Sequence, residues 1–383
     1  MRIAVVGPLR LPNPQGGMSR HCEELYSRIA ARGHDVTVYC ASRSGDGPSS
    51  YRGMKLRWLR ASGIAGLDRI RCGLAAAVAS LRGRYDIVHF HSLTSSAPCF
   101  VPRLGRAKVV VTVHRLEWRD EKWGPIGRAV LRASEWLVMR CAHAVITVSR
   151  NLEADLGRRY PRARPPRYVA NGVMVPESVD RALLGPHGLG ESEYALFVGR
   201  LTPEKGVDVL LDAFELLWDD AATRCELAIV GDAPKESDYA RQLRARGARL
   251  AAPVRFLGLQ HDDSLAALFA NARLYVTASH QEGQPLAVLE AMSCGRCVVA
   301  SDIPAHRELL GPAGVMVADG NAKDFAVAVA RLLADDSAIE RYGNAARRRI
   351  TDSDEFDWDR TATETEQILL AASPRRPAIR RPA

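Results

Sequence analysis

The chain of 383 residues lacks any apolar run long enough to cross a bilayer. Its longest apolar stretch, Cys72–Leu81, is interrupted by Gly73 and Ser80 and falls short of the roughly 20 residues that a spanning helix needs. The first residues, MRIAVVGP, predict a short buried strand that runs into a loop, whereas a secretory signal needs a longer apolar segment and a small-residue cleavage site. The sequence therefore predicts a cytoplasmic protein.

Cysteine patterns that would indicate disulfides or zinc are also missing. Six of the eight cysteines stand singly in apolar surroundings, as reduced core thiols do. Only Cys294 and Cys297 have the spacing of a redox pair, but they lie where we expect a helix to end, away from the helix N-terminus that would lower a thiol pKa. With no second pair nearby, we interpret this spacing as coincidence and predict no metal site.

Charged residues make up 25% of the chain and hydrophobic residues 47%, which are values of a globular protein, and the length suits two domains. The net charge of +9 favours an anionic ligand or surface, namely a nucleotide diphosphate, an anionic lipid or a nucleic acid. No finger, helix-turn-helix or aromatic stacking motif supports nucleic acid, so we predict no nucleic-acid partner.

Short Val/Ile/Leu runs alternate with amphipathic stretches along the whole chain, which is the pattern of α/β domains with parallel sheets. The predicted strands are 2–7, 35–40, 54–59, 86–91, 108–114, 144–149 and 167–172, then 194–199, 226–231, 254–258, 273–279, 296–301 and 314–319. Between the two series, Met174–Glu193 is rich in Pro, Gly and charge, and we interpret it as the connection between two domains. The predicted division is 1–176, 177–357, a helix over 358–372 that returns to the N-terminal domain, and a disordered tail over 373–383.

The strongest functional signal is HQEGQPLAVLEAMSCG, residues 280–295, which predicts a loop and then a helix with Pro285 in its first turn and Gly295 at its end. Nearly every residue of this helix is apolar except Glu290, and a buried carboxylate needs partners. Glu290 therefore either forms an internal salt bridge with an arginine or accepts hydrogen bonds from ligand hydroxyls. Glu282, in the loop after a strand, is either a ligand-binding or a solvated acid.

A second signal is FVGRLTPEKGVDVLLDAF, residues 197–214, which predicts a strand ending at Gly199 and a helix beginning around Glu204–Gly206. Arg200 and Lys205 flank the expected helix N-terminus, whose free amides and partial positive charge attract anions. The two cations either complete a diphosphate site or form a solvated surface pair.

Gly16 and Gly17 form a third signal, because they lie directly before an amphipathic helix, where glycine lets the backbone approach a ligand. The GxGxxG spacing of dinucleotide-binding proteins and a well-placed acid on the second strand are both missing. The sequence accordingly disfavours a dehydrogenase.

In combination these motifs resemble the retaining glycosyltransferases of family 4 over essentially the whole chain. Glu282 and Glu290 stand in the family's two-glutamate motif, Gly199–Gly206 in its diphosphate motif, and Gly16–Gly17 in its N-terminal glycine loop. Further matches are ARGHDVTVYC, DIVHFHS, TVH ending at His114, VANGV, AIVGDAP, VRFLG and SDIPAHREL. The resemblance implies the GT-B architecture, an α/β fold of two facing Rossmann-like domains with the active site in the cleft between them.

The resemblance also implies how a nucleotide-sugar donor would be bound. Arg200 and Lys205 would bind its diphosphate, Glu290 its ribose hydroxyls and Glu282 its sugar. Such enzymes need no metal or other cofactor, because fixed cations and helix dipoles take up the charge that grows on the leaving diphosphate. The sequence also has no suitably placed acidic cluster of the DxD type.

Further roles follow from the same resemblance. Backbone amides of the run Gly283, Gln284, Pro285 and Leu286 would hold sugar hydroxyls, and Gln284, where many relatives have an aromatic residue or Leu, could add a hydrogen bond. His114 would face the donor sugar or the departing phosphate, unless it is an ordinary strand-end histidine.

The implied reaction is transfer of a hexose or deoxyhexose, with retention, to a sugar, lipid-linked or small-molecule acceptor such as a cell-envelope glycan or glycolipid. Arg115, where relatives have a small residue, leaves the acceptor contacts open. The Arg- and Leu-rich segment Tyr51–Arg84 predicts either peripheral contact with an anionic membrane or an ordinary solvated face. The alternatives are an epimerase or phosphorylase on the same architecture, or a non-catalytic anion-binding module.

Overall fold

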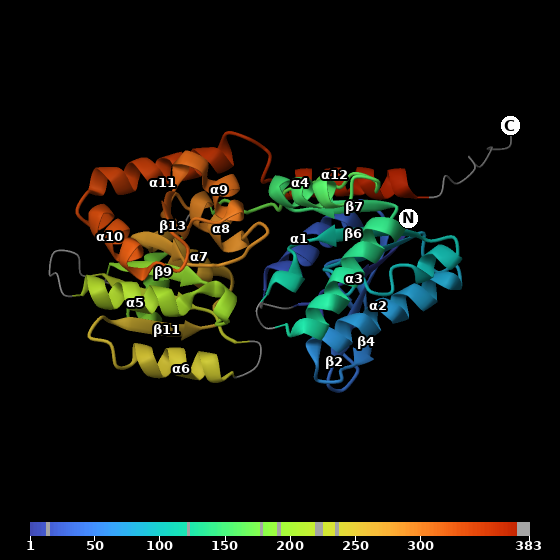
Figure 1. Ribbon diagram of the computed structural model, residues 1–383, viewed down its shortest axis with the longest axis horizontal. Helices are drawn as coiled ribbons and strands as arrows, with labels where there is room; N and C mark the ends of the chain where they lie inside the picture. Colours follow the sequence, from blue (N-terminus) through green and yellow to red (C-terminus); the bar gives the residue numbers. More distant parts are fainter. Residues whose placement is uncertain are drawn as a thin grey trace. The chain divides into compact units, whose positions relative to one another are not determined.

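The computed structural model describes residues 1–12, 16–120, 123–176, 179–189, 193–218, 225–233 and 237–373 (Figure 1). The chain divides into two compact units, and each is described by itself. The first comprises Met1–Asn13, His21–Val169 and Thr361–Ala383, and the second comprises Pro14–Arg20 and Ala170–Arg360.

Every strand predicted from the sequence is present. The first unit contains β1 Arg2–Val6, β2 Asp35–Ser42, β3 Ser50–Tyr51, β4 Met54–Arg60, β5 Ile87–His91, β6 Lys108–Val113, β7 Ala144–Thr147 and β8 Arg167–Tyr168. The second contains β9 Tyr194–Val198, β10 Glu226–Val230, β11 Val254–Gly258, β12 Leu274–Thr277, β13 Cys297–Ser301 and β14 Val315–Val317. β8 is shorter than predicted, because the backbone from Asn171 onward bonds to Gln284 and Phe356 instead of continuing beside β7.

Helices alternate with these strands. Those of the first unit are α1 Gly17–Ala31, α2 Ala65–Leu81, α3 Pro125–Cys141, α4 Arg150–Arg159 and α12 Trp358–Ala372, although the first residues of α1 and α12 group with the second unit. Those of the second unit are α5 Val207–Leu217, α6 Asp238–Gly247, α7 Asp262–Asn271, α8 Leu286–Ser293, α9 Pro304–Leu310, α10 Ala322–Leu333 and α11 Asp336–Thr351.

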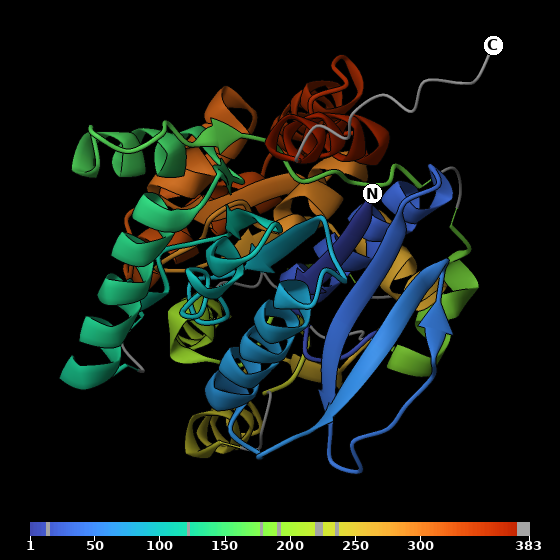
Figure 2. The same cartoon turned by 90° about the vertical axis from the view of Figure 1, so that its right-hand side faces the viewer.

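Parallel pairing dominates both sheets. The strand order of the first sheet is β3-β4-β2-β1-β5-β6-β7-β8, in which every described pair is parallel except β3 with β4, and β2 and β4 run side by side in blue in Figure 2. The order of the second sheet is β11-β10-β9-β12-β13-β14, and its described pairs are all parallel. Such sheets bury both faces, which explains the continuous apolar strands of the sequence.

Side-chain alternation gives the first sheet two different faces. Val88 and Phe90 of β5 join a hydrophobic core that includes residues of α2 and α3. His89 and His91 point to the opposite face, where Tyr26 of α1 contacts both histidines. One face is therefore apolar, and the other carries a polar stripe beneath α1.

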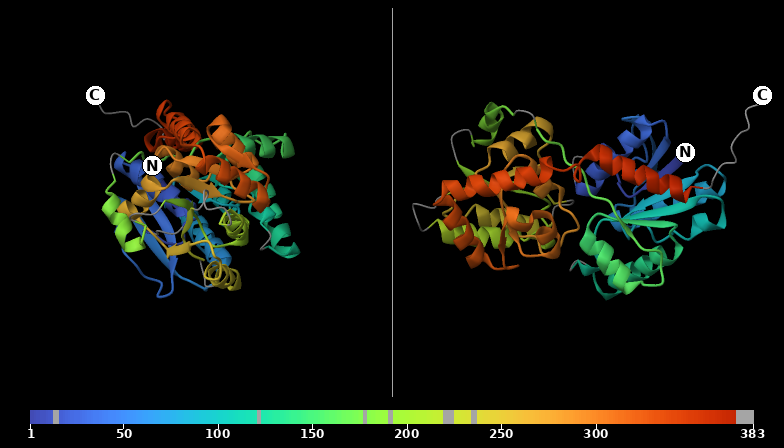
Figure 3. Two further views of the ribbon diagram at one scale, coloured as in Figure 1. Left: turned by 90° about the vertical axis from the view of Figure 1, so that its left-hand side faces the viewer. Right: turned by 90° about the horizontal axis from the view of Figure 1, so that it is seen from above.

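The C-terminal helix is tied to the first unit by an acidic side chain. Glu366 of α12, the red helix in the right-hand view of Figure 3, contacts Arg32 Nη1 over 2.8 Å and His34 Nε2 over 2.6 Å.

In the second unit, Phe197 of β9 packs with Phe214 of α5 and Phe325 of α10 in one core. On the other face of that sheet, Phe269 of α7 lies 5.8 Å from Tyr275 of β12, measured between ring centroids.

The structural division of the chain falls after Val169, whereas the sequence analysis placed the domain boundary after Pro176. The predicted connection contains a 3₁₀ helix, Arg181–His187, that belongs to the second unit. Residues 177, 178 and 190–192 of this region, Pro234 of the AIVGDAP match, and the predicted tail after Ser373 lie outside the described residues. No helix among the described residues is both long and apolar enough to span a membrane.

Candidate active site

The binding motifs of the second unit lie where the strand order reverses. β9 comes first in the chain, β10 and β11 follow on one side of it, and β12, β13 and β14 lie on the other. Ligands of open parallel sheets bind beyond the carboxyl ends of the strands at such a reversal. The chain after β9 carries Arg200 and Lys205, and the chain after β12 carries Glu282.

Two backbone contacts hold these loops together. Gly206 has a φ of 61°, and a Cβ atom added there would lie 2.2 Å from the Ala278 carbonyl oxygen. Only glycine allows this approach, because any side chain would collide with backbone. The His280 amide also donates to the Glu204 carbonyl oxygen over 3.1 Å. The two loops therefore form one continuous surface.

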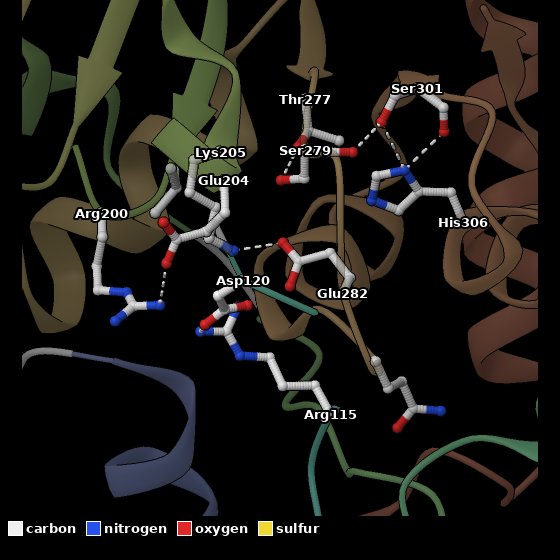
Figure 4. Close-up of polar contacts among 12 residues, drawn as sticks. Arg115, Asp120, Arg200, Glu204, Lys205, Thr277, Ser279, Glu282, Ser301 and His306 are labelled. Carbon is white, nitrogen blue, oxygen red and sulfur yellow. Dashed lines mark hydrogen bonds and ion pairs between the residues drawn. The ribbon is translucent and has the colours of Figure 1, made fainter. Parts of the chain in front are cut away.

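A buried ion pair lies at the centre of this surface. The Lys205 ammonium contacts the Glu282 carboxylate, and the two side chains are only 16% and 10% exposed (Figure 4). Arg200 Nη2 lies 3.2 Å from the carboxylate of Glu204. The structure thus brings two predicted site residues, Lys205 and Glu282, into direct contact and leaves Arg200 paired beside them.

Two predicted helix starts were wrong by a few residues. α5 begins at Val207, because the left-handed Gly206 ends a preceding 3₁₀ turn, Pro203–Lys205, and cannot continue as α-helix. α8 begins at Leu286, with Pro285 in an extended conformation at its N-cap and not in its first turn. Proline has no amide hydrogen, so the donors of this run are the amides of Gly283, Gln284 and Leu286.

The side chain of Gln284 is engaged within the second unit. Its Oε1 accepts the Asn171 backbone amide over 2.5 Å, and its backbone carbonyl accepts from the Asn171 side chain over 3.1 Å. Asn171 belongs to the VANGV match, so the two motifs contact each other.

Glu290 forms the salt bridge that the sequence analysis weighed against a ligand contact. Its Oε1 lies 3.2 Å from Arg20 Nη1, and its side chain is 17% exposed. Burial raises the pKa of Glu290, and the Arg20 charge opposes that rise. A Cβ atom at Gly17 would lie 3.5 Å from Leu286 Cδ1, so the glycine loop of Gly16 and Gly17 also lies at the start of α8.

A buried polar cluster supports the loop that carries Glu282. The Ser301 hydroxyl donates to the Ser279 carbonyl over 2.5 Å, and His306 Nδ1 donates to the Ser301 carbonyl over 2.8 Å (Figure 4). Ser301 and His306 are both completely buried. These bonds fix the backbone directly after β12, which positions Glu282.

His114 follows β6 in the first unit and lies among other histidines. Its Nε2 is 3.1 Å from His91 Nδ1, and the His21 ring centroid is 4.8 Å from its own. His91 ends β5, which neighbours β1 at the reversal of the first strand order. Gly7, after β1, has a φ of 150°, and a Cβ atom there would lie 2.6 Å from His91 Cβ. The glycine makes room for His91.

Burial keeps these histidines neutral. It lowers the pKa of His89 to about 3, and it lowers the pKa of His91 and of His114 well below the ordinary value, with neighbouring histidines adding to the shift. Neutral imidazoles can both donate and accept a hydrogen bond.

Among the described residues, His21, His91 and His114 could hold a metal ion, since one nitrogen of each lies within 4.8 Å of the others. The sequence analysis predicted no metal site and assigned a role to His114 alone. The overlooked signal was the spacing of polar residues along buried strands. His89 and His91 alternate along β5, as Thr112 and His114 do along and after β6, so each pair shares a face.

Arg115, next to His114, forms an ion pair inside the first unit. Its Nη2 lies 2.7 Å from Asp120 Oδ2, and the Asp120 side chain is almost completely buried (Figure 4). The Asp120 carboxylate therefore neutralises the positive charge that Arg115 introduces at a position where relatives have a small residue.

The surroundings of Cys294 and Cys297 disfavour the thiolate that a redox pair needs. All eight cysteines lie among the described residues and are free thiols. Burial raises the pKa of Cys294 to about 11 and that of Cys297 to about 12, which opposes thiolate formation.

An apolar surface is exposed on α2, in the segment for which the sequence left membrane contact open. We call it the α2 face, and it combines one stripe of α2 with the adjacent 3₁₀ helix Val101–Leu104 and its preceding residue. Its exposed apolar members are Leu67, Leu74, Val78, Leu81, Phe100 and Leu104, and Arg71, Arg82 and Arg84 are exposed beside them.

Comparison with known proteins shows the family to which this chain belongs. The model described as Glycosyl transferases group 1 matches residues 192–335, and that described as Glycosyltransferase Family 4 matches residues 15–175. A glycogen synthase of Mycobacterium tuberculosis is 30% identical over 97% of this chain and 95% of its own length. The predicted resemblance is confirmed.

Solved structures show the same fold. The sucrose-phosphate synthase of Thermosynechococcus elongatus has a TM-score of 0.84 at 23% identity, over 97% of this chain and all (100%) of its own. Anabaena Alr3699/HepE in complex with UDP-glucose has a TM-score of 0.79 at 20% identity, with the same coverage of 97% and 100%. The chain therefore belongs to family 4 of the glycosyltransferases, and its two Rossmann-like domains have the GT-B fold.

Proposed function

We propose that this glycosyltransferase moves a hexose or deoxyhexose from a nucleotide-diphosphate sugar to an acceptor with retention of the anomeric configuration. The contact between Lys205 and Glu282 carries the proposal. It holds a cation suited to a phosphate beside a carboxylate suited to sugar hydroxyls, and a nucleotide sugar presents those two groups next to each other. Because the similar Anabaena protein holds UDP-glucose, uridine nucleotides are the first to test.

The proposed roles follow the charges of the second unit. Arg200 and Lys205 bind the diphosphate and stabilise the negative charge that grows on it as the glycosidic bond breaks, so we propose transfer without a metal. Glu290, oriented by Arg20, accepts hydrogen bonds from the ribose hydroxyls. Glu282 acts on the transferred sugar. The hydroxyl oxygens of this sugar also accept hydrogen bonds from the backbone amides of Gly283, Gln284 and Leu286.

His114 is proposed to hydrogen-bond an oxygen of the transferred sugar or of the leaving phosphate. The proposed acceptor is a cell-envelope glycan or glycolipid. The α2 face supports a lipid-linked acceptor, because exposed apolar side chains next to arginines are typical of proteins that contact an anionic membrane.

A nucleotide screen tests the proposal. We would record thermal unfolding of the wild-type chain with UDP, GDP and ADP, since a bound ligand stabilises the folded state by mass action. We expect one of these three nucleotides to raise the unfolding temperature of the protein. Lys205→Met should weaken binding of that nucleotide about ten- to a hundredfold, as loss of a charge-assisted bond does. Lys323→Met removes the same charge from an exposed position on α10 and should leave binding unchanged.

Other outcomes identify the alternatives. Failure of every nucleotide diphosphate to stabilise the chain would refute the donor assignment. Binding of random DNA that weakens steeply with salt would indicate an anion-binding module instead. Conversion or hydrolysis of the donor sugar without an acceptor would indicate an epimerase.

A further inference from the structure

A chain of hydrogen bonds crosses the buried face of the first sheet and ends at His114. Thr112 Oγ1 lies 2.8 Å from His89 Nε2, and His89 Nδ1 lies 2.7 Å from the Tyr26 hydroxyl. The same hydroxyl lies 2.6 Å from His91 Nε2, and His91 Nδ1 lies 3.1 Å from His114 Nε2. The first four side chains are buried, whereas His114 is half-buried. We call these five residues the histidine chain.

The hydrogens along the histidine chain must all point the same way. A neutral imidazole has one donor and one acceptor nitrogen, and a tyrosine hydroxyl has a single hydrogen. Tyr26 can therefore donate to only one of His89 and His91, and the other must donate to Tyr26. Each histidine that accepts at one nitrogen donates at its other nitrogen. Two arrangements remain, with the hydrogens pointing either toward His114 or toward Thr112.

Thr112 distinguishes the two arrangements. When the hydrogens point toward His114, the Thr112 hydroxyl donates to His89, and each hydrogen up to His114 has an acceptor. In the reverse arrangement His89 donates to Thr112, whose own hydrogen then needs another acceptor. Among the described residues, His89 is the hydrogen-bond partner of the Thr112 hydroxyl. A buried donor without an acceptor destabilises the folded state, because it loses its hydrogen bond to water and gains none in return, so the first arrangement is favoured.

We propose that the histidine chain holds His114 with a lone pair on Nε2 and a hydrogen on Nδ1, and that Tyr26, His89 and His91 are positioning residues for it. No described residue hydrogen-bonds to His114 Nδ1, so this N–H is the end of the chain and donates to a ligand oxygen. Hydrogen bonds aligned in one sense polarise one another, which makes His114 a stronger donor than an isolated imidazole. The identity of that oxygen, in a sugar hydroxyl or a phosphate, rests on the proposed function.

The proposed arrangement is incompatible with a metal ion on the three neighbouring histidines. A metal ligand presents a lone pair, but His91 Nδ1 carries the hydrogen that it donates to His114. A metal bound by His91 Nδ1 and His114 Nε2 would reverse every bond back to Thr112 and leave its buried hydroxyl hydrogen without an acceptor. Tautomers and metal content therefore test one and the same arrangement.

Nitrogen NMR of the full chain with labelled histidine tests the arrangement without any ligand. We expect His89, His91 and His114 each to carry the hydrogen on Nδ1 and a lone pair on Nε2. A hydrogen on Nε2 of His91 or His114 would overturn the inference. So would stoichiometric zinc, measured by elemental analysis in the purified protein and lost in His21→Ala.

Two tyrosine variants test whether the chain acts on catalysis. Tyr26→Phe removes the central hydroxyl. Tyr39→Phe is the matched control, because Tyr39 is a buried tyrosine on β2 of the first unit whose hydroxyl pairs with Tyr85 over 3.0 Å. With the donor found by the nucleotide screen, we expect Tyr26→Phe to lower kcat about two- to tenfold, the effect of one lost hydrogen bond, with unchanged nucleotide affinity. Tyr39→Phe should leave kcat unchanged.

A double-mutant cycle separates positioning from a general effect on folding. His114→Asn keeps an N–H donor near the Nδ1 position but has no nitrogen at the Nε2 position, so it is uncoupled from the histidine chain. In this background Tyr26→Phe should lower kcat no further. An equal loss in both backgrounds would show that Tyr26 acts only on structure. If the protein transfers no sugar at all, the proposed function fails while the NMR result still decides the arrangement.

Discussion

Acid should destabilise the first unit through His89. This imidazole is completely buried, and the neighbours that face it, Tyr26 from α1, His91 from β5, Thr112 from β6 and the nearby His21, include no negative charge. Burial lowers the pKa of His89 to about 3, whereas a histidine in an unfolded chain has a pKa of about 6.5. Between these values the unfolded chain binds a proton that the folded chain does not. The free energy of unfolding therefore falls as the pH falls below the unfolded value.

The size of the effect follows from the unfolded pKa. At pH 5 that pKa lies about 1.5 units above the pH, and each unit corresponds to about 1.36 kcal/mol, so His89 lowers the free energy of unfolding by about 2 kcal/mol relative to pH 8. The folded value does not enter as long as it stays below 5. Burial also lowers the pKa values of His91 and His114, so acid destabilises the folded first unit through these two histidines in the same direction.

Hydrogen exchange of the β5 and β6 amides, corrected for the intrinsic exchange rate, measures this free energy in the first unit alone. The difference between pH 8 and pH 5 should be smaller by about 2 kcal/mol in His89→Gln than in the wild type. Thr112→Val contacts the same imidazole but removes no titrating group, so it should keep the wild-type difference. Equal pH dependence of His89→Gln and the wild type would refute the reasoning, because His89 would then be protonated in the folded state.

Two further predictions concern the reaction, and a third concerns the α2 face. Glu290→Gln should weaken nucleotide diphosphate binding about ten- to a hundredfold, whereas Glu282→Gln should leave that affinity nearly unchanged and lower kcat steeply. Calorimetry and turnover assays on folded variants check both effects, and equal losses of nucleotide affinity in the two variants would contradict the assigned roles. Transfer should continue in excess EDTA and NMR of the product should show the donor's anomeric configuration, so an inverted product would exclude the retaining mechanism. The wild type should co-sediment with anionic vesicles at low salt. Leu74→Glu on the α2 face should reduce the vesicle affinity about tenfold or more by placing an acid among its arginines, whereas Val327→Glu at an exposed position on α10 should not. Unchanged sedimentation of both variants would indicate an ordinary solvated face.

The sequence by itself determined the two parallel sheets and most of the candidate site. Buried strands require short apolar runs and covering helices require amphipathic ones, and both are local patterns that a single sequence displays. Arg200, Lys205 and Glu282 were identifiable because glycines and charged residues follow directly after such strands. Both helix starts were predicted a few residues too early, since Gly206 and Pro285 end up outside the helices through backbone conformations that residue type alone does not fix.

Only the tertiary structure decided which side chains meet. Lys205 and Glu282 are 77 positions apart, and their contact depends on β9 lying beside β12 and on the approach of Gly206 to Ala278. Glu290 could have faced either an arginine or a ligand, and the placement of Arg20 paired the two.

The histidine chain shows the same limit. The sequence could place His89 and His91 on one face, because strand alternation is local. It could not place Tyr26 between them, because that position depends on how α1 packs on the sheet. Hydrogen bonds need donor and acceptor atoms within about 3 Å, and between residues distant in the chain only tertiary packing sets distances that finely.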